Sequence, residues 1–181
     1  MEETQKKILV IAGSLKQNSS NLAILKHISQ LLPTNYEVKF YGGLAELPHF
    51  SPDLDNEKVP SQVIDLRNEI QISDGIIICT PEYVFSIPST LKNLIEWCVS
   101  TTVFSEKPVA LITASASGEK GHEELKLLMK TIYTKFNDET TLLIQGIKAK
   151  VNSEGKVIEA EILKSLENLV ASFHDLLEQN Q

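Results

Sequence analysis

The sequence lacks the features that mark membrane and secreted proteins. Its unbroken apolar runs, such as residues 8–12 and 75–79, are far shorter than the roughly 20 residues that a helix needs to cross a bilayer. The acidic start, residues 1–4, has neither the basic nor the apolar region of a signal peptide. The two cysteines, Cys79 and Cys98, show no CxxC spacing, so we expect free, buried thiols in a reducing compartment. These absences predict a cytoplasmic protein.

Runs of positive charge and metal-binding motifs are also missing. The formal net charge is −7 and no stretch concentrates Lys or Arg, so attraction to nucleic acid or to an anionic membrane should be weak. The histidines form no HExxH motif, which argues against a metal site. Neither GxGxxG nor GxxxxGK(S/T) is present. The acidic pair Glu123 and Glu124 is interpreted as a solvated helix face. Small molecules are the expected partners.

What is present fits one ordinary globular domain. A hydrophobic fraction of 42% with 23% charged residues is average for a globular protein and argues against disorder. A chain of 181 residues can bury a continuous core without disulfides or metal. We therefore expect a single domain that spans residues 1–181.

Short apolar runs alternate with helical patterns along the chain. Strands are expected at residues 6–12, 36–41, 75–80, 108–114 and 140–144. Helices are expected around the apolar positions of residues 22–32, 63–70, 88–98, 125–136 and 162–177, with Pro88 at a first helical position. Five strands alternating with five helices predict an α/β fold, a parallel sheet with helices on both faces. Ligands bind such a sheet beyond the carboxyl ends of its strands.

The loop after the first strand, residues 13–20, suits an anion. It places a glycine, several hydroxyl groups and one cation between a buried strand and a helix N-terminus. The free N–H groups and the dipole of that terminus favour a phosphate, and the missing nucleotide motifs leave a mononucleotide phosphate as the candidate. The alternative is an ordinary polar turn with a Ser or Asn cap.

The loop after the third strand, residues 81–87, suits a flat ring. Prolines at 81 and 88 stiffen a segment that presents aromatic and apolar side chains beside polar main chain. The alternative is a rigid connector in which Tyr83 and Phe85 simply close the core.

These two loops together resemble a known family. The segments Ile11–Lys16, Asn18–Asn21 and Thr80–Tyr83, followed by Ser86–Pro88, Leu91–Asn93 and Trp97, resemble the NADPH-dependent FMN reductases, which include chromate, quinone and azo-dye reductases. The resemblance implies a flavodoxin-like three-layer fold with strand order 2-1-3-4-5. It also implies FMN as cofactor, NADPH or NADH as co-substrate, and hydride passed through FMN to quinones, flavins, chromate or azo compounds. A homodimer or homotetramer is implied, formed through the region around the Pro-Glu-Tyr motif and the helix after it, with Trp97 and its neighbours near the interface.

The resemblance implies a set of cofactor-binding residues on three loops. Those expected near the phosphate are Ser14, Lys16, Ser19, Ser20 and Asn21. Those expected against the ring or its ribityl chain are Pro81, Glu82, Tyr83, Val84 and Phe85. Those expected on the other side of the ring are Ser115, Ser117 and Gly118. No catalytic side chain is expected, because the cofactor carries the chemistry.

Two departures from the family pattern keep alternatives open. Lys16 stands where Arg is common, which keeps the charge but loses bidentate phosphate recognition, so the choice between NADPH and NADH stays open. Val84 and Phe85 stand where Asn and often Gly follow the Pro-Glu-Tyr motif. The alternatives are a non-enzymatic FMN electron carrier and a related module that has lost FMN.

Overall fold

A computed structural model describes residues 5–180 and contains one five-stranded parallel sheet with order β2-β1-β3-β4-β5. The strands are β1 (Lys7–Ala12), β2 (Glu37–Phe40), β3 (Gly75–Thr80), β4 (Val109–Ala114) and β5 (Thr141–Ile144). The helices are α1 (Ser20–Leu31), α2 (Ser61–Ile72), α3 (Ser89–Glu96), α4 (Glu119–Thr131) and α5 (Ala160–Glu178). The predicted fold class and strand order are confirmed. The N-terminal segment on which the signal-peptide argument rests lies outside the described residues.

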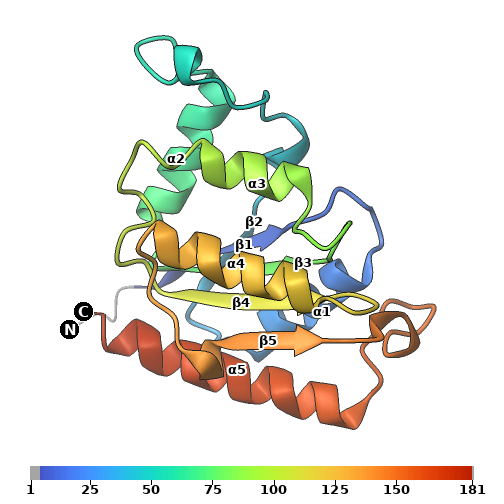
Figure 1. Ribbon diagram of the computed structural model, residues 1–181. Coiled ribbons are helices and arrows are strands. Elements are labelled where there is room, and N and C mark those ends of the chain that lie inside the picture. The colour runs from blue at the N-terminus through green and yellow to red at the C-terminus, as the bar shows by residue number, and fades with distance from the viewer. Residues whose placement is uncertain (1–4, 181) are drawn as a thin grey trace.

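The sheet lies between two layers of helices (Figure 1), and a separate hydrophobic cluster fills each side of it. Helices α1 and α5 cover one face, and α2, α3 and α4 cover the other. Every residue of β3 and β4 is buried, as expected for central parallel strands, whereas β2 at the edge has no buried residue. This arrangement explains why the central strands read as continuous apolar runs and the edge strand reads as polar.

Helix α4 ends earlier than its apolar pattern predicts. The expected pattern continues to Phe136, but the helix stops at Thr131, and Tyr133 adopts a left-handed conformation with φ 61°. Phe136 still packs against the core from the connecting loop, which is why the sequence pattern continued. Pro88 stands just before the first residue of α3 rather than within it. Among residues 5–180, no helix is long and apolar enough to cross a membrane.

The three loops of interest meet at one edge of the sheet. Strands β1, β3 and β4 are neighbours and run parallel, so their carboxyl ends lie side by side. The N–H of Gly13 donates to the carbonyl of Cys79 at 2.9 Å and brings the first loop against the end of β3. The fold thereby gathers the segments that the sequence singled out.

Gly13 generates a test of this close approach. A Cβ atom at position 13 would lie 2.5 Å from Oγ1 and 2.7 Å from Cβ of Thr80. We expect Gly13→Ala to lower the free energy of unfolding by about 1–3 kcal/mol, because the strand ends must separate. Urea denaturation measures the change. The control is Gly42→Ala, whose Cβ would meet nothing within 4 Å and should cost nothing. Equal unfolding midpoints for the two variants would contradict the packing described here.

Candidate functional site

The first loop presents a row of backbone N–H groups at the start of α1. Ser19 caps the helix: its Oγ accepts from the N–H of Leu22 at 3.2 Å. Within the described residues, the N–H groups of residues 17–21 make no hydrogen bond, and Asn18 adopts a left-handed conformation with φ 54°. Unpaired N–H groups beside a left-handed residue at a helix N-terminus suit an anion, and the helix dipole strengthens this preference. The loop therefore fits a phosphate group.

Ser14 and Lys16 lie in the same loop, before these N–H groups. Ser14 Oγ accepts from the N–H of Lys16 at 3.3 Å and lies 3.2 Å from the hydroxyl of Tyr83. The Lys16 side chain is exposed and forms no ion pair with another described residue. Ser20 is the half-buried first residue of α1. The same loop thus carries hydroxyl groups and a cation as well as the unpaired N–H groups.

The Asn21 side chain lies beneath the loop, not on its surface. The residue is 5% exposed; its Nδ2 donates to the carbonyl of Ala114 at 3.2 Å, and its Oδ1 accepts from the thiol of Cys79 at 3.1 Å. Burial raises the pKa of Cys79, so the thiol stays protonated and can donate. Asn21 ties the start of α1 to the ends of β3 and β4. Its side chain is already occupied, which leaves its backbone N–H for an anion.

Residues Tyr83–Ser86 form a tight two-residue hairpin. The N–H of Tyr83 donates to Ser86 O at 2.8 Å, and the N–H of Ser86 donates to Tyr83 O at 3.1 Å. The central residues Val84 (φ 53°) and Phe85 (φ 60°) are both left-handed. Such turns normally carry Asn-Gly, and each bulkier residue costs about 1–3 kcal/mol in backbone strain.

The apolar side chains of this hairpin point away from the core. Tyr83 is 51% exposed, Val84 94% and Phe85 76%. The interpretation in which Tyr83 and Phe85 close the core is therefore wrong, because these side chains face solvent. Pro81, at the base of the hairpin, is buried.

Glu82 fastens the hairpin to the start of α4. Its carboxylate accepts from the N–H of Gly118 at 3.2 Å and from the N–H of Gly121 at 2.8 Å. These N–H groups belong to a helix N-terminus, where a carboxylate is electrostatically favoured. Glu82 therefore connects two of the three loops, and its carboxylate oxygens are occupied by backbone groups.

Glu124 holds the same hairpin from below. Its Oε2 accepts from the hydroxyl of Ser86 at 2.6 Å and from the N–H of Ile87 at 3.0 Å, and its Oε1 lies 3.3 Å from the ammonium of Lys92. Its interpretation as part of a solvated face is wrong, because α4 turns it toward the hairpin. Glu123 does face solvent and pairs with Lys120. Gly121 also contacts the hairpin, through Glu82. Glu124 lies three residues after Gly121 and so on the same face of α4, and this spacing is the signal that could have identified it.

The third loop follows β4 and contains Ser115, Ser117 and Gly118. Ser115 is fixed by its backbone, which pairs with Ile144 O at 3.1 Å and Ile147 N–H at 3.2 Å. Ser117 is exposed. Gly118 is left-handed with φ 91°, and a Cβ there would lie 2.9 Å from Leu143. The site residues expected from sequence are thus brought to one edge of the sheet, with Asn21 and Glu82 turned inward.

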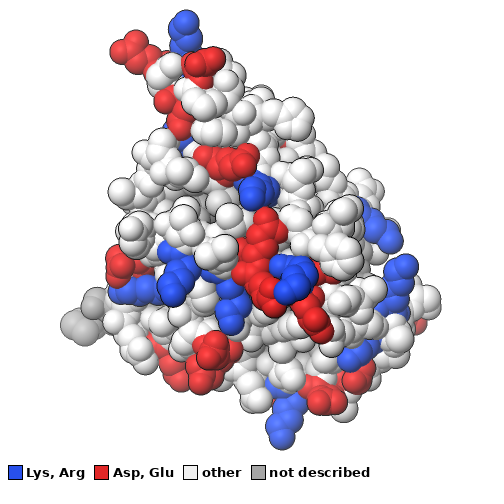
Figure 2. Space-filling view, viewed as in Figure 1, with Lys and Arg blue, Asp and Glu red and all other residues white. Residues whose placement is uncertain are grey.

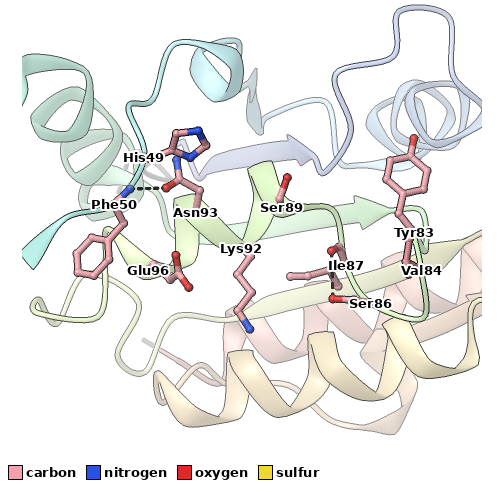
Figure 3. A pocket seen from close by; sticks show the side chains of 10 residues that line it. All are labelled: His49, Phe50, Tyr83, Val84, Ser86, Ile87, Ser89, Lys92, Asn93 and Glu96. Carbon is pink, nitrogen blue, oxygen red and sulfur yellow. Dashed lines mark hydrogen bonds between the residues drawn. The ribbon is translucent and has the colours of Figure 1, made fainter.

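A cavity of about 570 Å³ opens beside the hairpin (Figure 3). Its wall includes Tyr83 and Val84 on one side and His49 and Phe50 on the other. Asn93 fixes the far wall, because its Oδ1 accepts from the N–H of Phe50 at 2.7 Å (Figure 3). Tyr83 therefore belongs both to the cavity and, through Ser14, to the anion-binding loop.

Trp97 supports that wall from inside. It is fully buried, its Nε1 donates to Pro48 O at 2.8 Å, and its ring meets Phe50 edge-on at 5.1 Å between centroids. The core encloses the Trp97 side chain itself, and the expectation that this region lies near a subunit interface stays a prediction. The tryptophan anchors the loop that carries His49 and Phe50.

Comparison with known proteins identifies a family and its relatives. The family model for NADPH-dependent FMN reductases matches residues 6–142. A quinone reductase of Escherichia coli K12 is 26% identical, with 95% of each chain covered. A subunit of an NADH:(hydroxy)cinnamate reductase of Vibrio ruber is 28% identical, with 91% of this chain and 84% of that protein covered.

Solved structures of a flavoenzyme and of a flavodoxin are also similar to this chain. A flavoenzyme NAD(P)H:(acceptor) oxidoreductase of Paracoccus denitrificans superposes with a TM-score of 0.82 at 25% identity and covers 97% of this chain and 98% of its own. An archaeal flavodoxin superposes with a TM-score of 0.64 at 12% identity over 95% of this chain and 99% of its own, which shows the shared fold. The chain thus has a flavodoxin-like fold and belongs to the NADPH-dependent FMN reductase family.

Proposed function

We propose that this protein is an FMN-containing oxidoreductase that uses NAD(P)H to reduce quinones and other small acceptors. The observation that carries the proposal is the joining of three loops by side-chain hydrogen bonds. Tyr83 meets Ser14, Glu82 binds Gly118, and Asn21 binds Ala114. The anion-binding loop and the cavity of about 570 Å³ thereby share one side chain, Tyr83.

The residues present fit FMN. The unpaired N–H groups of residues 17–21 suit its phosphate, and the exposed ring of Tyr83 offers a flat apolar surface close by. When bound, FMN supplies the hydride chemistry between NAD(P)H and the acceptor. We assign no catalytic side chain, since the protein has only to bind, orient and exclude water.

We assign roles to the site residues by their placement. Those proposed to hold the phosphate are Ser14, Lys16, Ser19, Ser20 and the backbone of Asn21. Those proposed beside the ring are Pro81, Tyr83, Val84, Phe85, Ser115, Ser117 and Gly118. Asn21 and Glu82 are positioning residues, because their side chains bind other loops rather than face the site.

Three further properties are proposed from the sequence and the family. The protein acts as one domain, it resides in the cytoplasm, and it forms a homodimer or homotetramer. Its mass in solution, measured by light scattering, tests the oligomeric state. Because the Trp97 side chain is buried within the chain, we propose that its neighbours, rather than its ring, form the interface in this region.

The experiment that tests the proposed function is purification followed by a visible spectrum and a turnover assay. We expect a yellow protein that oxidises NADH or NADPH with a quinone and shows ping-pong kinetics, because donor and acceptor use one site in turn. A yellow protein without NAD(P)H oxidation would indicate an electron carrier. A colourless protein that takes up no added FMN would indicate a module that has lost the cofactor.

The anion site is tested by adding a negative charge to it. Ser14→Asp should weaken FMN binding at least about tenfold, because its carboxylate would face the phosphate. Titration of FMN into the cofactor-free protein, followed by flavin fluorescence, measures the dissociation constant. The control is Ser105→Asp, an exposed position in the loop before β4, at the opposite edge of the sheet. The same FMN affinity in both variants would remove this loop from the site.

The Glu124 contact with the hairpin predicts a pH-dependent stability. Burial alone would raise the pKa of Glu124, but hydrogen bonds from Ser86, the N–H of Ile87 and Lys92 outweigh burial and lower it. A lowered folded-state pKa stabilises the protein above the unfolded value of about 4.3, and this contribution is lost as pH falls through the folded-state pKa.

Glu124→Gln should therefore cost about 1 kcal/mol at pH 7 and less toward pH 3. Urea denaturation at several pH values measures the difference between variant and parent. The control is Glu123→Gln, whose exposed pair with Lys120 should matter little. A cost for Glu124→Gln that is the same at pH 7 and pH 3 would contradict the assigned contacts.

A further inference from the structure

The hairpin tip at Val84 and Phe85 combines backbone strain with exposed apolar surface. Both residues are left-handed, where Asn and Gly are the unstrained choices, and both expose most of their side chains. Neither stability nor solubility benefits from this choice. Strained residues persist where surrounding contacts enforce them, and they cluster at ligand-binding sites.

Contacts on both sides enforce this conformation. Glu82 and Glu124 hold the two arms of the hairpin against α4, and Tyr83 Oη contacts Ser14. The strained residues themselves contribute none of these side-chain bonds. The hairpin is therefore a fixed support that presents two apolar side chains at a defined place.

That place is between two hollows on the surface. Val84 lines the cavity of about 570 Å³ together with Tyr83 and Phe50. Phe85 lines a second, more open hollow of about 520 Å³ over α4, together with Leu127, which is 64% exposed. A flat molecule that enters beside Tyr83 would meet apolar carbon on the tip.

The charges around these hollows disfavour an anion. Their walls carry three carboxylates, on Glu96, Glu123 and Glu124, against two ammonium groups. Lys92 lies 3.3 Å from Glu124, and Lys120 lies 2.7 Å from Glu123, so both cations are already paired. In Figure 2, red and blue side chains stand next to one another across the face that carries α4, with no extended blue patch.

We propose that Val84 and Phe85 are specificity-determining residues that select flat, uncharged acceptors, of the quinone class, over anionic ones. The inference rests on the proposed function. In the overall reaction NAD(P)H gives up a hydride, and the quinone takes up the two electrons with that hydrogen and one solvent proton to become a hydroquinone. The tip contributes apolar contact to the quinone, while an anion there loses hydration and finds no unpaired cation among the residues that line the two hollows.

The test exchanges the tip for residues that favour the same turn. Val84→Asn/Phe85→Gly is compared with the parent for 1,4-naphthoquinone and for 1,4-naphthoquinone-2-sulfonate, which differ by one anionic group. We expect the ratio of kcat/KM for the uncharged quinone to kcat/KM for the sulfonate to fall by roughly tenfold, because kcat/KM for the uncharged quinone decreases. The two quinones differ in reduction potential, but this difference affects the ratio equally in parent and variant and cancels when the two ratios are compared. Phe85→Leu should retain the parent ratio.

The matched control is Tyr133→Gly. Tyr133 is also an exposed, left-handed aromatic residue, but it lies beyond the end of α4, bonded to Glu106 at the opposite edge of the sheet. Both replacements relieve strain, so both should raise Tm by an amount on the order of 2–4 °C or more. Only the change at the tip should alter the acceptor ratio.

A readout independent of turnover completes the test. Calorimetric titration of 1,4-naphthoquinone into the oxidised, FMN-loaded protein without NAD(P)H should give a roughly tenfold weaker dissociation constant for the tip variant. An unchanged ratio and an unchanged quinone affinity would overturn the proposal. So would a change confined to FMN affinity, which would limit the tip to holding the cofactor, or a fall in solution mass, which would place it in a subunit interface. A parent protein that binds no FMN would instead refute the proposed function.

Discussion

The arrangement of the site depends on the attachment of one hairpin to helix α4 by two carboxylates. Glu82 reaches the N–H groups of Gly118 and Gly121, and Glu124 reaches Ser86 and Ile87. A hairpin of this length cannot hold its own conformation in water, least of all with two strained residues at its tip. The free N-terminus of α4 supplies donors that a carboxylate satisfies well. The same contacts fix Tyr83 where it meets Ser14, so the anion site depends on them as well.

The fold could be predicted from the sequence because each strand type leaves its own pattern. β3 is buried on both faces and reads as the unbroken run Gly75–Thr80, whereas the edge strand β2 alternates with polar residues. The predicted helix boundaries are less accurate where residues beyond the end of a helix still pack against the core. Phe136 fits the apolar spacing of α4 yet packs from a loop, because the left-handed Tyr133 ends the chain's helical path first.

The loops that form the site could be predicted, but the work of individual side chains could not. Sequence places Asn21 in the anion loop, yet only the fold brings Ala114 and Cys79 close enough to occupy its amide. Glu123 and Glu124 look alike in sequence. Successive residues on a helix point in different directions, so Glu123 faces solvent and Glu124 faces the hairpin. Trp97 could be taken for a surface residue until the loop at Pro48 is seen to cover it. Partners far apart in sequence leave no local signal.

The hairpin shows where local sequence preference and the site disagree. Asn-Gly at positions 84 and 85 would relax the turn and reduce exposed apolar surface, and the flanking bonds between Tyr83 and Ser86 would still form. Packing does not account for Val and Phe there, since both side chains project into solvent. Val84 and Phe85 strain the backbone and do not contribute to the core. Contact with a molecule outside the chain is the explanation that we propose for them. Val84 lines the cavity beside Tyr83 and Phe85 lines the hollow over α4, so the apolar tip supplies contact area to both, and the paired Lys92 and Lys120 supply no attraction for an anion.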